Sequence, residues 1–146
     1  MVNHRINVNT SQGGQPKMSP DLDLYRLLNC VRGPGDPLYK YLRASITEAL
    51  RIRFLVAFIT ESGARLMAKP LQEATGRGAR VTILTGTYLY NTEPYALEYL
   101  QEKVGPALEL RVYTEPGRSF HPKAYFFDLP HDSEVFISSA NLSWTA

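Results

Sequence analysis

A short stretch near the end of the sequence gathers side chains that suit phosphate chemistry. His121 offers an imidazole, Lys123 an ammonium group and Asp128 a carboxylate, while Ser139 adds a hydroxyl and Asn141 an amide. A phosphodiester is anionic, and Lys, Ser and Asn supply the positive charge and the hydrogen-bond donors that hold it. Neutral imidazole can attack phosphorus, and imidazolium can protonate the leaving oxygen near neutral pH. These residue types predict metal-free cleavage of a phosphodiester.

Two short apolar runs predict the strands that position these side chains. The runs are Ala124–Phe127 and Val135–Ile137, and residues 129–133 predict a turn between them. His121 and Lys123 are two positions apart, so their side chains share one face of a strand. The serine and asparagine after the second run have the same spacing. We therefore expect all four groups to converge at one end of the sheet.

Upstream, the sequence predicts alternating helices and strands. Helices are predicted at Asp21–Val31, Leu38–Ile52, Ser62–Thr75 and Pro94–Val104, and strands at Phe54–Ile59, Val81–Leu84 and Leu108–Tyr113. The continuous apolar run Phe54–Ile59 is typical of a strand buried on both faces. The alternation at Leu108–Tyr113 predicts a strand nearer an edge. The order predicts an α/β fold with a mostly parallel or mixed β-sheet flanked by helices.

Length and composition indicate a single domain after a leader. Residues 1–20 are rich in Gly, Pro, Ser and Asn and predict a flexible leader. The remaining residues 21–146 can form one core, since 44% of the chain is hydrophobic and 21% charged. The single cysteine excludes an intrachain disulfide. Neither a signal peptide nor an apolar run of about 20 residues is present, which predicts a cytoplasmic protein without membrane contact.

The polar residues also resemble a known family. His121, Lys123 and Asp128, followed by Ser139 and Asn141, resemble the HxKxxxxD and GSxN signature of the phospholipase D superfamily. The resemblance covers about residues 37 to 146 and is closest to the nuclease-like branch, as in metal-independent restriction endonucleases and the N-terminal domain of some superfamily 2 helicases. It implies a phospholipase D-like fold and a phosphodiesterase or nuclease that needs no cofactor and no metal.

The resemblance also implies a role for each matching residue. His121 would be the nucleophile that forms a phosphohistidine, with Lys123, Ser139 and Asn141 binding the phosphate. Asp128 would complete the catalytic motif as a supporting residue, and its odd spacing from the histidine argues against contact with substrate. Ser138 stands where the family has glycine. Family members continue with another strand, so we expect this domain to be truncated at its C-terminus.

The chain holds a single copy of the motif, whereas the family mechanism uses two histidines. His4 and His131 are predicted to be solvated, in the leader and in a turn. A homodimer would supply the second His121. The expected partner is nucleic acid, with DNA preferred, and the domain is expected to be a module of a helicase or restriction protein. Two alternatives stay open: a catalytically weak domain that only binds nucleic-acid phosphate, and a phosphodiesterase acting on lipid or small molecules.

Two further sets of side chains have more than one interpretation. Tyr88, Tyr90 and Tyr95 form either a wall that faces substrate or a cap on the edge of the sheet. Four arginines are either ordinary solvated residues or a basic rim for a nucleic-acid backbone: Arg77, Arg80, Arg111 and Arg118.

Overall fold

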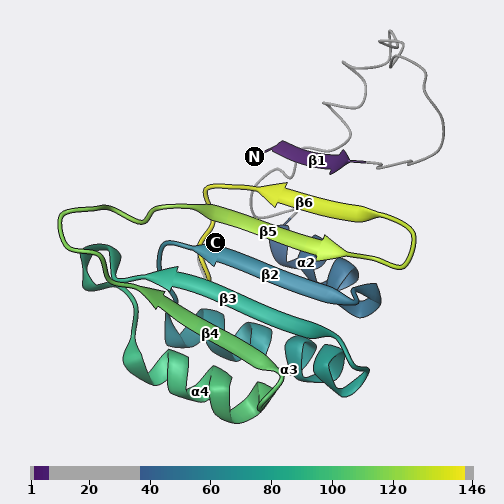
Figure 1. Cartoon of the computed structure of the whole chain (residues 1–146), viewed down its shortest axis with the longest axis horizontal. Helices are drawn as coiled ribbons and strands as arrows, with labels where there is room; N and C mark the ends of the chain where they lie inside the picture. The colour runs from purple at the N-terminus through teal and green to yellow at the C-terminus, as the bar shows by residue number, and fades with distance from the viewer. Residues whose placement is uncertain (1, 7–36, 144–146) are drawn as a thin grey trace, which may run out of the picture.

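The computed structural model describes residues 2–6 and 37–143, which form one mixed sheet and three helices (Figure 1). The strands are β1 (Val2–Ile6), β2 (Arg51–Val56), β3 (Arg80–Gly86), β4 (Leu108–Tyr113), β5 (Lys123–Asp128) and β6 (Ser133–Ile137). The helices are α2 (Leu38–Glu48), α3 (Glu61–Gly76) and α4 (Pro94–Val104), with a 3₁₀ turn, η1, at Tyr88–Tyr90.

The sheet has the strand order β1-β6-β5-β2-β3-β4. Strands β2, β3 and β4 run parallel, and β5 pairs antiparallel with both β2 and β6. The predicted α/β class with a mixed sheet is confirmed, and β4 is the predicted edge strand. The predicted strands around Ala124–Phe127 and Val135–Ile137 are also confirmed as the hairpin β5–β6.

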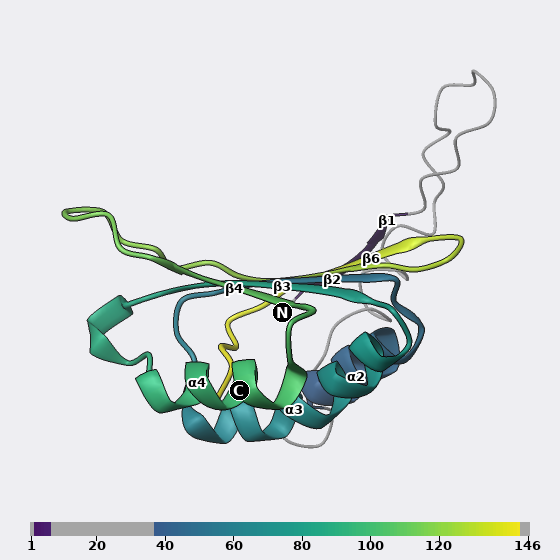
Figure 2. The ribbon, with the colours of Figure 1, turned by 60° about the horizontal axis from the view of Figure 1, so that its bottom comes forward.

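All three helices lie on one face of the sheet (Figure 2). The side chains of β2 alternate accordingly: Ile52, Phe54 and Val56 are fully buried on the helix side, while Arg53 and Leu55 are partly exposed. The prediction that this strand is buried on both faces is wrong. Within the described residues no helix covers the second face, and the apolar run looked continuous because it extends past the strand into buried Ala57 and Ile59.

Aromatic side chains of neighbouring strands fill the core between the sheet and the helices. Phe54 packs edge-on against Tyr125 and Phe127, with ring centroids 5.0 and 5.9 Å apart. All three rings are almost completely buried. Truncating such a ring to alanine costs about 3–5 kcal/mol, so this cluster fixes β5 beside β2.

Several predicted boundaries need correction. The helix predicted to reach Ile52 ends at Glu48, and Arg51 already begins β2. Residues Val2–Ile6, predicted as part of the flexible leader, form the edge strand β1 antiparallel to β6. The helix predicted at Asp21–Val31 lies outside the described residues. By contrast, α3 and α4 follow their predicted ranges closely.

Candidate functional site

His121 and Lys123 lie at the carboxyl edge of the parallel strands. Because β5 is antiparallel to β2, its first residue, Lys123, stands opposite Val56, the last residue of β2. The loops that follow β2 and β3 also begin at this edge of the sheet. In open α/β sheets, ligands bind outside the carboxyl ends of the strands. The fold therefore places the imidazole and the ammonium group where a ligand site is expected.

The two side chains are in direct contact. Lys123 Nζ lies 3.1 Å from Nδ1 and 3.0 Å from Nε2 of His121. An ammonium group only donates hydrogen bonds, so this contact suits the neutral imidazole, which has one acceptor nitrogen. His121 is exposed and Lys123 is half-buried. Burial lowers the pKa of Lys123 below its usual value because the charged form loses solvation.

A short loop after β6 lies beside this pair. The Ser138 backbone N–H donates to the carbonyl of Lys123 at 3.0 Å, which extends the β5–β6 ladder by one bond. The Ser138 hydroxyl accepts a hydrogen bond from the Ala140 N–H at 2.8 Å. Ser138 stands where the GSxN signature has glycine, and its side chain shapes the turn.

Asn141 is fixed by the backbone that follows β2. Its Oδ1 accepts hydrogen bonds from the N–H groups of Ala57 at 3.0 Å and Phe58 at 3.4 Å. Only the oxygen of an amide accepts, so these two bonds define which way the side chain is turned. Its NH₂ group makes no hydrogen bond within the described residues. The amide can therefore donate to an anionic oxygen.

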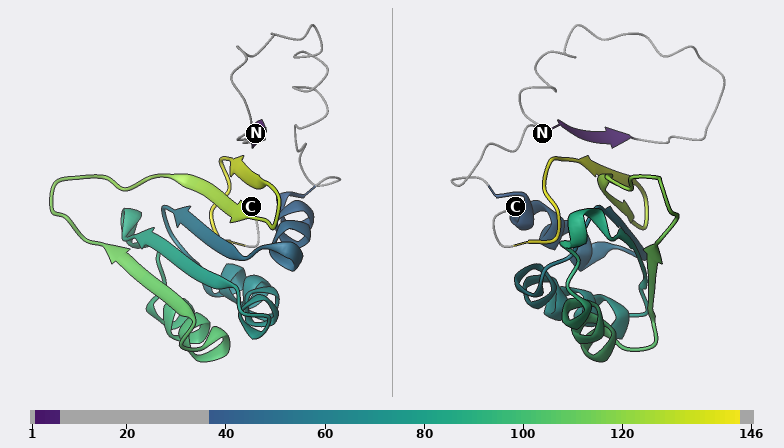
Figure 3. Two further views of the ribbon diagram at one scale, coloured as in Figure 1. Left: turned by 45° about the vertical axis from the view of Figure 1, so that its right-hand side comes forward. Right: turned by 90° about the vertical axis from the view of Figure 1, so that its left-hand side faces the viewer.

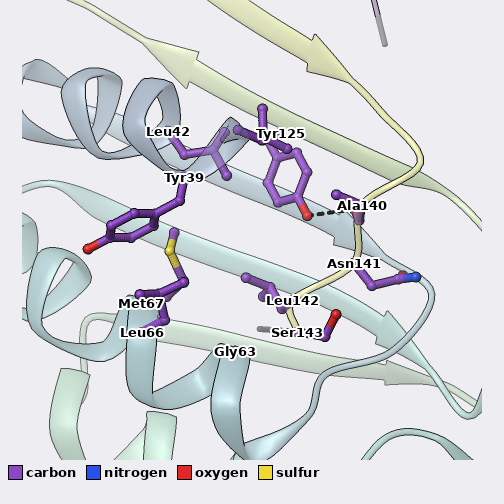
Figure 4. A pocket seen from close by; sticks show the side chains of 11 residues that line it. Tyr39, Leu42, Gly63, Leu66, Met67, Tyr125, Ala140, Asn141, Leu142 and Ser143 are labelled. Atoms are coloured by element: carbon purple, nitrogen blue, oxygen red, sulfur yellow. Dashed lines mark hydrogen bonds between the residues drawn. The ribbon is translucent and has the colours of Figure 1, made fainter. Parts of the chain in front are cut away.

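The buried side chain of Tyr125 contacts the same loop from the core. Its hydroxyl donates to the carbonyl of Ala140 at 2.8 Å, and Figure 4 shows this bond at the rim of a small apolar pocket. Burial raises the pKa of Tyr125 strongly, which keeps the hydroxyl protonated as a donor. The pocket, about 30 Å³, has room for about one water molecule. The Asn141 amide points away from it.

The first turn of α3 holds the end of the loop. The Thr60 N–H donates to the carbonyl of Leu142 at 3.0 Å, and Ile59 and Leu142 form an isolated parallel bridge. A Cβ at Gly63 would lie 2.0 Å from the Leu142 oxygen, so this position needs glycine. Sequence reasoning did not single out Gly63; a glycine in the first turn of a helix was the available signal.

Ser139 lies in the loop beside Lys123, whereas Asp128 lies at the other end of β5. Ser139 is exposed in the loop, and its hydroxyl has no partner in the described part of the chain. Asp128, predicted with the catalytic residues, ends β5, about 17 Å from Lys123 at the usual rise of a strand. Its carboxylate pairs with Arg53 at 2.7 Å. The structure places His121 in contact with Lys123 and the loop that carries Ser139 and Asn141 next to the Lys123 backbone, and it leaves Asp128 at the other end of β5.

The four arginines do not form one rim. Arg80 begins β3 at the amino end, and Arg77 donates to the Ile46 carbonyl near that end. Arg111 pairs with Glu109 along β4. Among the four, only Arg118 lies near His121, in the connection from β4 to β5.

The aromatic residues near His121 make a second feature of this edge. The rings of Tyr88 and His121 are in contact, with centroids 4.2 Å apart. Tyr90 belongs to the same turn and is 95% exposed, whereas Tyr95 lies on α4 and contacts Arg65. Tyr88 therefore faces the candidate site. Sequence reasoning left this interpretation undecided and did not find Phe120, which lies beside Tyr113.

The described residues include neither a cluster placed to bind a metal nor a helix that could span a membrane. No group of three or more His, Cys, Asp or Glu side chains is placed to hold a metal ion among them. The helices within the same residues are too short or too polar to cross a membrane.

Comparison with known proteins identifies a shared fold. No protein-family model and no curated protein matches the chain. Among solved structures, the polyphosphate kinase from Porphyromonas gingivalis is similar over 77% of this chain and 20% of that one, with a TM-score of 0.54 and 16% identity. The chain thus spans about a fifth of that protein. At this identity the likeness concerns the fold, a mixed sheet with helices that is consistent with a phospholipase D-like domain.

Proposed function

We propose that this domain is a phospholipase D-like phosphodiesterase that cleaves nucleic acid, DNA in the first instance, with His121 as the nucleophile. The observation that carries the proposal is the contact of exposed His121 with Lys123, next to the backbone-anchored Asn141. An imidazole nucleophile, a cation and an amide donor are the groups needed to hold a phosphodiester and attack it. The likeness to a part of a polyphosphate kinase supports the coarser statement, a fold that also occurs in a phosphoryl-transfer enzyme.

The proposed reaction has two balanced steps. In the first, a ring nitrogen of His121 attacks phosphorus, the bond to the leaving oxygen breaks, and an imidazolium protonates that oxygen. In the second, water attacks the phosphorus of the phosphohistidine, the bond from phosphorus to the His121 nitrogen breaks, and the water gives its proton to the imidazole that acted as the acid. Lys123, Ser139 and Asn141 stabilise the charge that spreads over the equatorial oxygens.

The second imidazole is proposed to come from another copy of the chain. His131 lies in the turn between β5 and β6, at the far end of β5 from His121. His4 pairs in register with Val135, within the strand β6 rather than at its carboxyl end. Neither is at the edge that holds His121. A twofold dimer would bring two copies of His121 across one phosphate.

A second candidate is transfer of the phosphoryl group to an acceptor other than water. The fold match is to a polyphosphate kinase, whose name denotes phosphoryl transfer. The same phosphohistidine would form, and only the acceptor of the second step would differ. We retain nuclease activity as the first candidate because an exposed site at a sheet edge admits a polymer, and we propose a helicase or restriction protein as its context.

The decisive experiment compares two histidine variants in a cleavage assay with EDTA. Single-stranded and duplex DNA would be incubated with the unsubstituted chain, His121→Ala and the matched control His131→Ala. We expect cleavage by the unsubstituted chain and the control, and none by His121→Ala. Intact-protein mass spectrometry should detect a chain that carries a DNA fragment linked through phosphate, and this species should depend on His121.

Other outcomes would redirect the proposal. Equal cleavage by His121→Ala would reject this nucleophile. DNA binding that weakens with salt, without cleavage by any protein, would favour the phosphate-binding domain instead. Turnover of a lipid or small diester, with DNA left intact, would favour the other open alternative.

A further inference from the structure

A groove lined by aromatic rings adjoins His121. It measures about 450 Å³ and lies between the turn η1 and the connection from β4 to β5. The connection projects beyond the sheet (Figure 3), so one wall of the groove stands clear of the core. Its aromatic lining consists of Tyr88, Tyr90, Tyr113 and Phe120.

The groove and the phosphate-handling residues share a wall. The Tyr88 ring lines the groove and packs against the His121 imidazole at 4.2 Å. Phe120, on the opposite wall, precedes His121 directly in the chain and stacks on Tyr113 with centroids 5.1 Å apart. A phosphate held at His121 would therefore lie next to the aromatic groove.

Charge in the groove argues against a second phosphate as the occupant. Glu115 and Arg118 are its only charged lining residues, and they pair at 3.4 Å. The Tyr113 hydroxyl also donates to Glu115 at 2.6 Å. The lining is thus balanced in charge and includes a carboxylate, which disfavours a polyphosphate chain. A neutral planar ring with N–H groups fits both the aromatic walls and this acceptor.

Exposed tyrosine at the mouth of the groove points the same way. Tyr90 is 95% exposed, and both Leu89 and Tyr90 have positive φ, 48° and 58°. Positive φ values are costly for non-glycine residues, and residues that adopt them are enriched at functional sites. Stacking of bases on exposed aromatic rings is the general means by which proteins hold single strands.

We propose that this groove binds an unpaired nucleobase next to the phosphate held at His121, so that the substrate is single-stranded nucleic acid. This inference rests on the proposed phosphodiesterase function. A paired base has both faces covered by its neighbours in the helix, so a duplex cannot fill the groove without fraying. Stacking also tolerates any base, so little sequence preference is expected.

Binding measurements with matched strands test the groove. His121→Ala serves as the background, which prevents turnover, and Tyr90→Ala, Tyr90→Phe and Tyr95→Ala are added to it. Fluorescence anisotropy would compare a labelled single strand, its duplex and a strand with the same backbone but abasic sites. Tyr90 is almost fully exposed, so its loss should leave the fold intact, and Tyr95 controls for loss of an exposed tyrosine elsewhere.

We expect Tyr90→Ala to weaken single-strand binding by about five- to tenfold, the size of one stacking contact. Tyr90→Phe and Tyr95→Ala should bind as the background does, and abasic strand should bind equally weakly to all. Equal affinity of the background and Tyr90→Ala for the base-containing strand would overturn the inference, as would tighter binding of duplex than of single strand.

Cleavage assays with the Tyr90 substitutions in a chain that retains His121 distinguish failure of the proposed groove from failure of the proposed phosphodiesterase function. Cleavage that requires His121 but is indifferent to Tyr90 and to abasic sites would reject the groove and keep the phosphodiesterase. Base-dependent binding through Tyr90 with no His121-dependent cleavage would reject the phosphodiesterase and keep the nucleobase groove.

Discussion

Both ends of β5 carry a charged residue, but the two charges have different partners. At the first end, Lys123 contacts exposed His121 and its pKa is lowered by burial. At the other, Asp128 is matched by Arg53 and Arg51, at 2.7 and 3.8 Å. A charge that is paired has little left to offer a ligand, whereas the charge of Lys123 faces an imidazole. The end at Lys123 is therefore called the proposed reacting end, and the end at Asp128 the structural end.

The largest expected effect is at the reacting end. Lys123→Ala should lower kcat/KM for the proposed cleavage by about 10²–10³-fold, as removal of one preorganised charge stabiliser does. Thermal stability should change little, because the substituted ammonium pays a desolvation cost in the folded chain. Cleavage kinetics and a melting curve measure the two effects. A large drop in melting temperature with unchanged kinetics would contradict the contrast between the ends.

Deprotonation of Lys123 should reproduce part of this effect. The lowered pKa means that its charge is present below that pKa and is lost as pH rises through it, so activity should decline at a lower pH than for an ordinary lysine. Stability moves the other way: the unfolded chain keeps the proton to higher pH, so folding gains as pH rises between the two pKa values. Lys123→Arg, which stays charged, should shift the decline upward; an unmoved alkaline limb would exclude Lys123 as its source.

A third substitution tests whether the loop that carries Asn141 contributes to the proposed site as much as the contact between His121 and Lys123. Gly63→Ala places a methyl group against the Leu142 carbonyl and should cost about 3 kcal/mol, at the upper end for overpacking. It should also weaken phosphate binding, because Asn141 belongs to the same segment. Urea unfolding and binding of inorganic phosphate provide the two readouts. Gly76→Ala, where a Cβ meets nothing, is the matched control; equal behaviour of the two variants would refute the close approach.

The smallest effect is expected at the structural end. Asp128→Asn removes the ion pair with Arg53. The side chains of both residues are more than a third exposed, so solvent screening limits the loss of folding free energy to below about 1 kcal/mol. kcat/KM should stay within about twofold because the carboxylate is about 17 Å from Lys123. A drop in activity as large as that of Lys123→Ala would show that the two ends act as one unit.

Much of the fold follows from local patterns in the sequence. α3 and α4 combine helical spacing of apolar residues with clear boundaries, Thr60 as N-cap and Gly105 as the residue after the last turn. The end of α2 was missed because Leu50 and Ile52 continue the apolar spacing although the chain has already turned into β2. The edge strand β1 was missed because three of its five residues, Asn3, His4 and Arg5, are polar and because the strand depends on pairing with β6.

The candidate site was predictable where neighbouring strands set it. Spacing within the β5–β6 hairpin was sufficient to bring Lys123 and the loop at Ser139 to one end. Asp128 was expected to be a supporting residue without contact to substrate, and it ends the same strand about 17 Å from Lys123. Tyr88 meets His121, and Phe120 meets Tyr113, only through the tertiary fold, and no local pattern signals such contacts.

The hydrogen bonds from Thr60 to the Leu142 carbonyl have a consequence for how the protein folds and opens. The two residues are separated by 82 positions, so the loop that carries Asn141 can dock only after the sheet and α3 exist. Contacts that close such long loops form late, and segments held by few hydrogen bonds open below the global unfolding free energy. Amide exchange should therefore be faster at residues 139–142 than in β2. A modest concentration of urea should silence the site while the β-sheet is still intact.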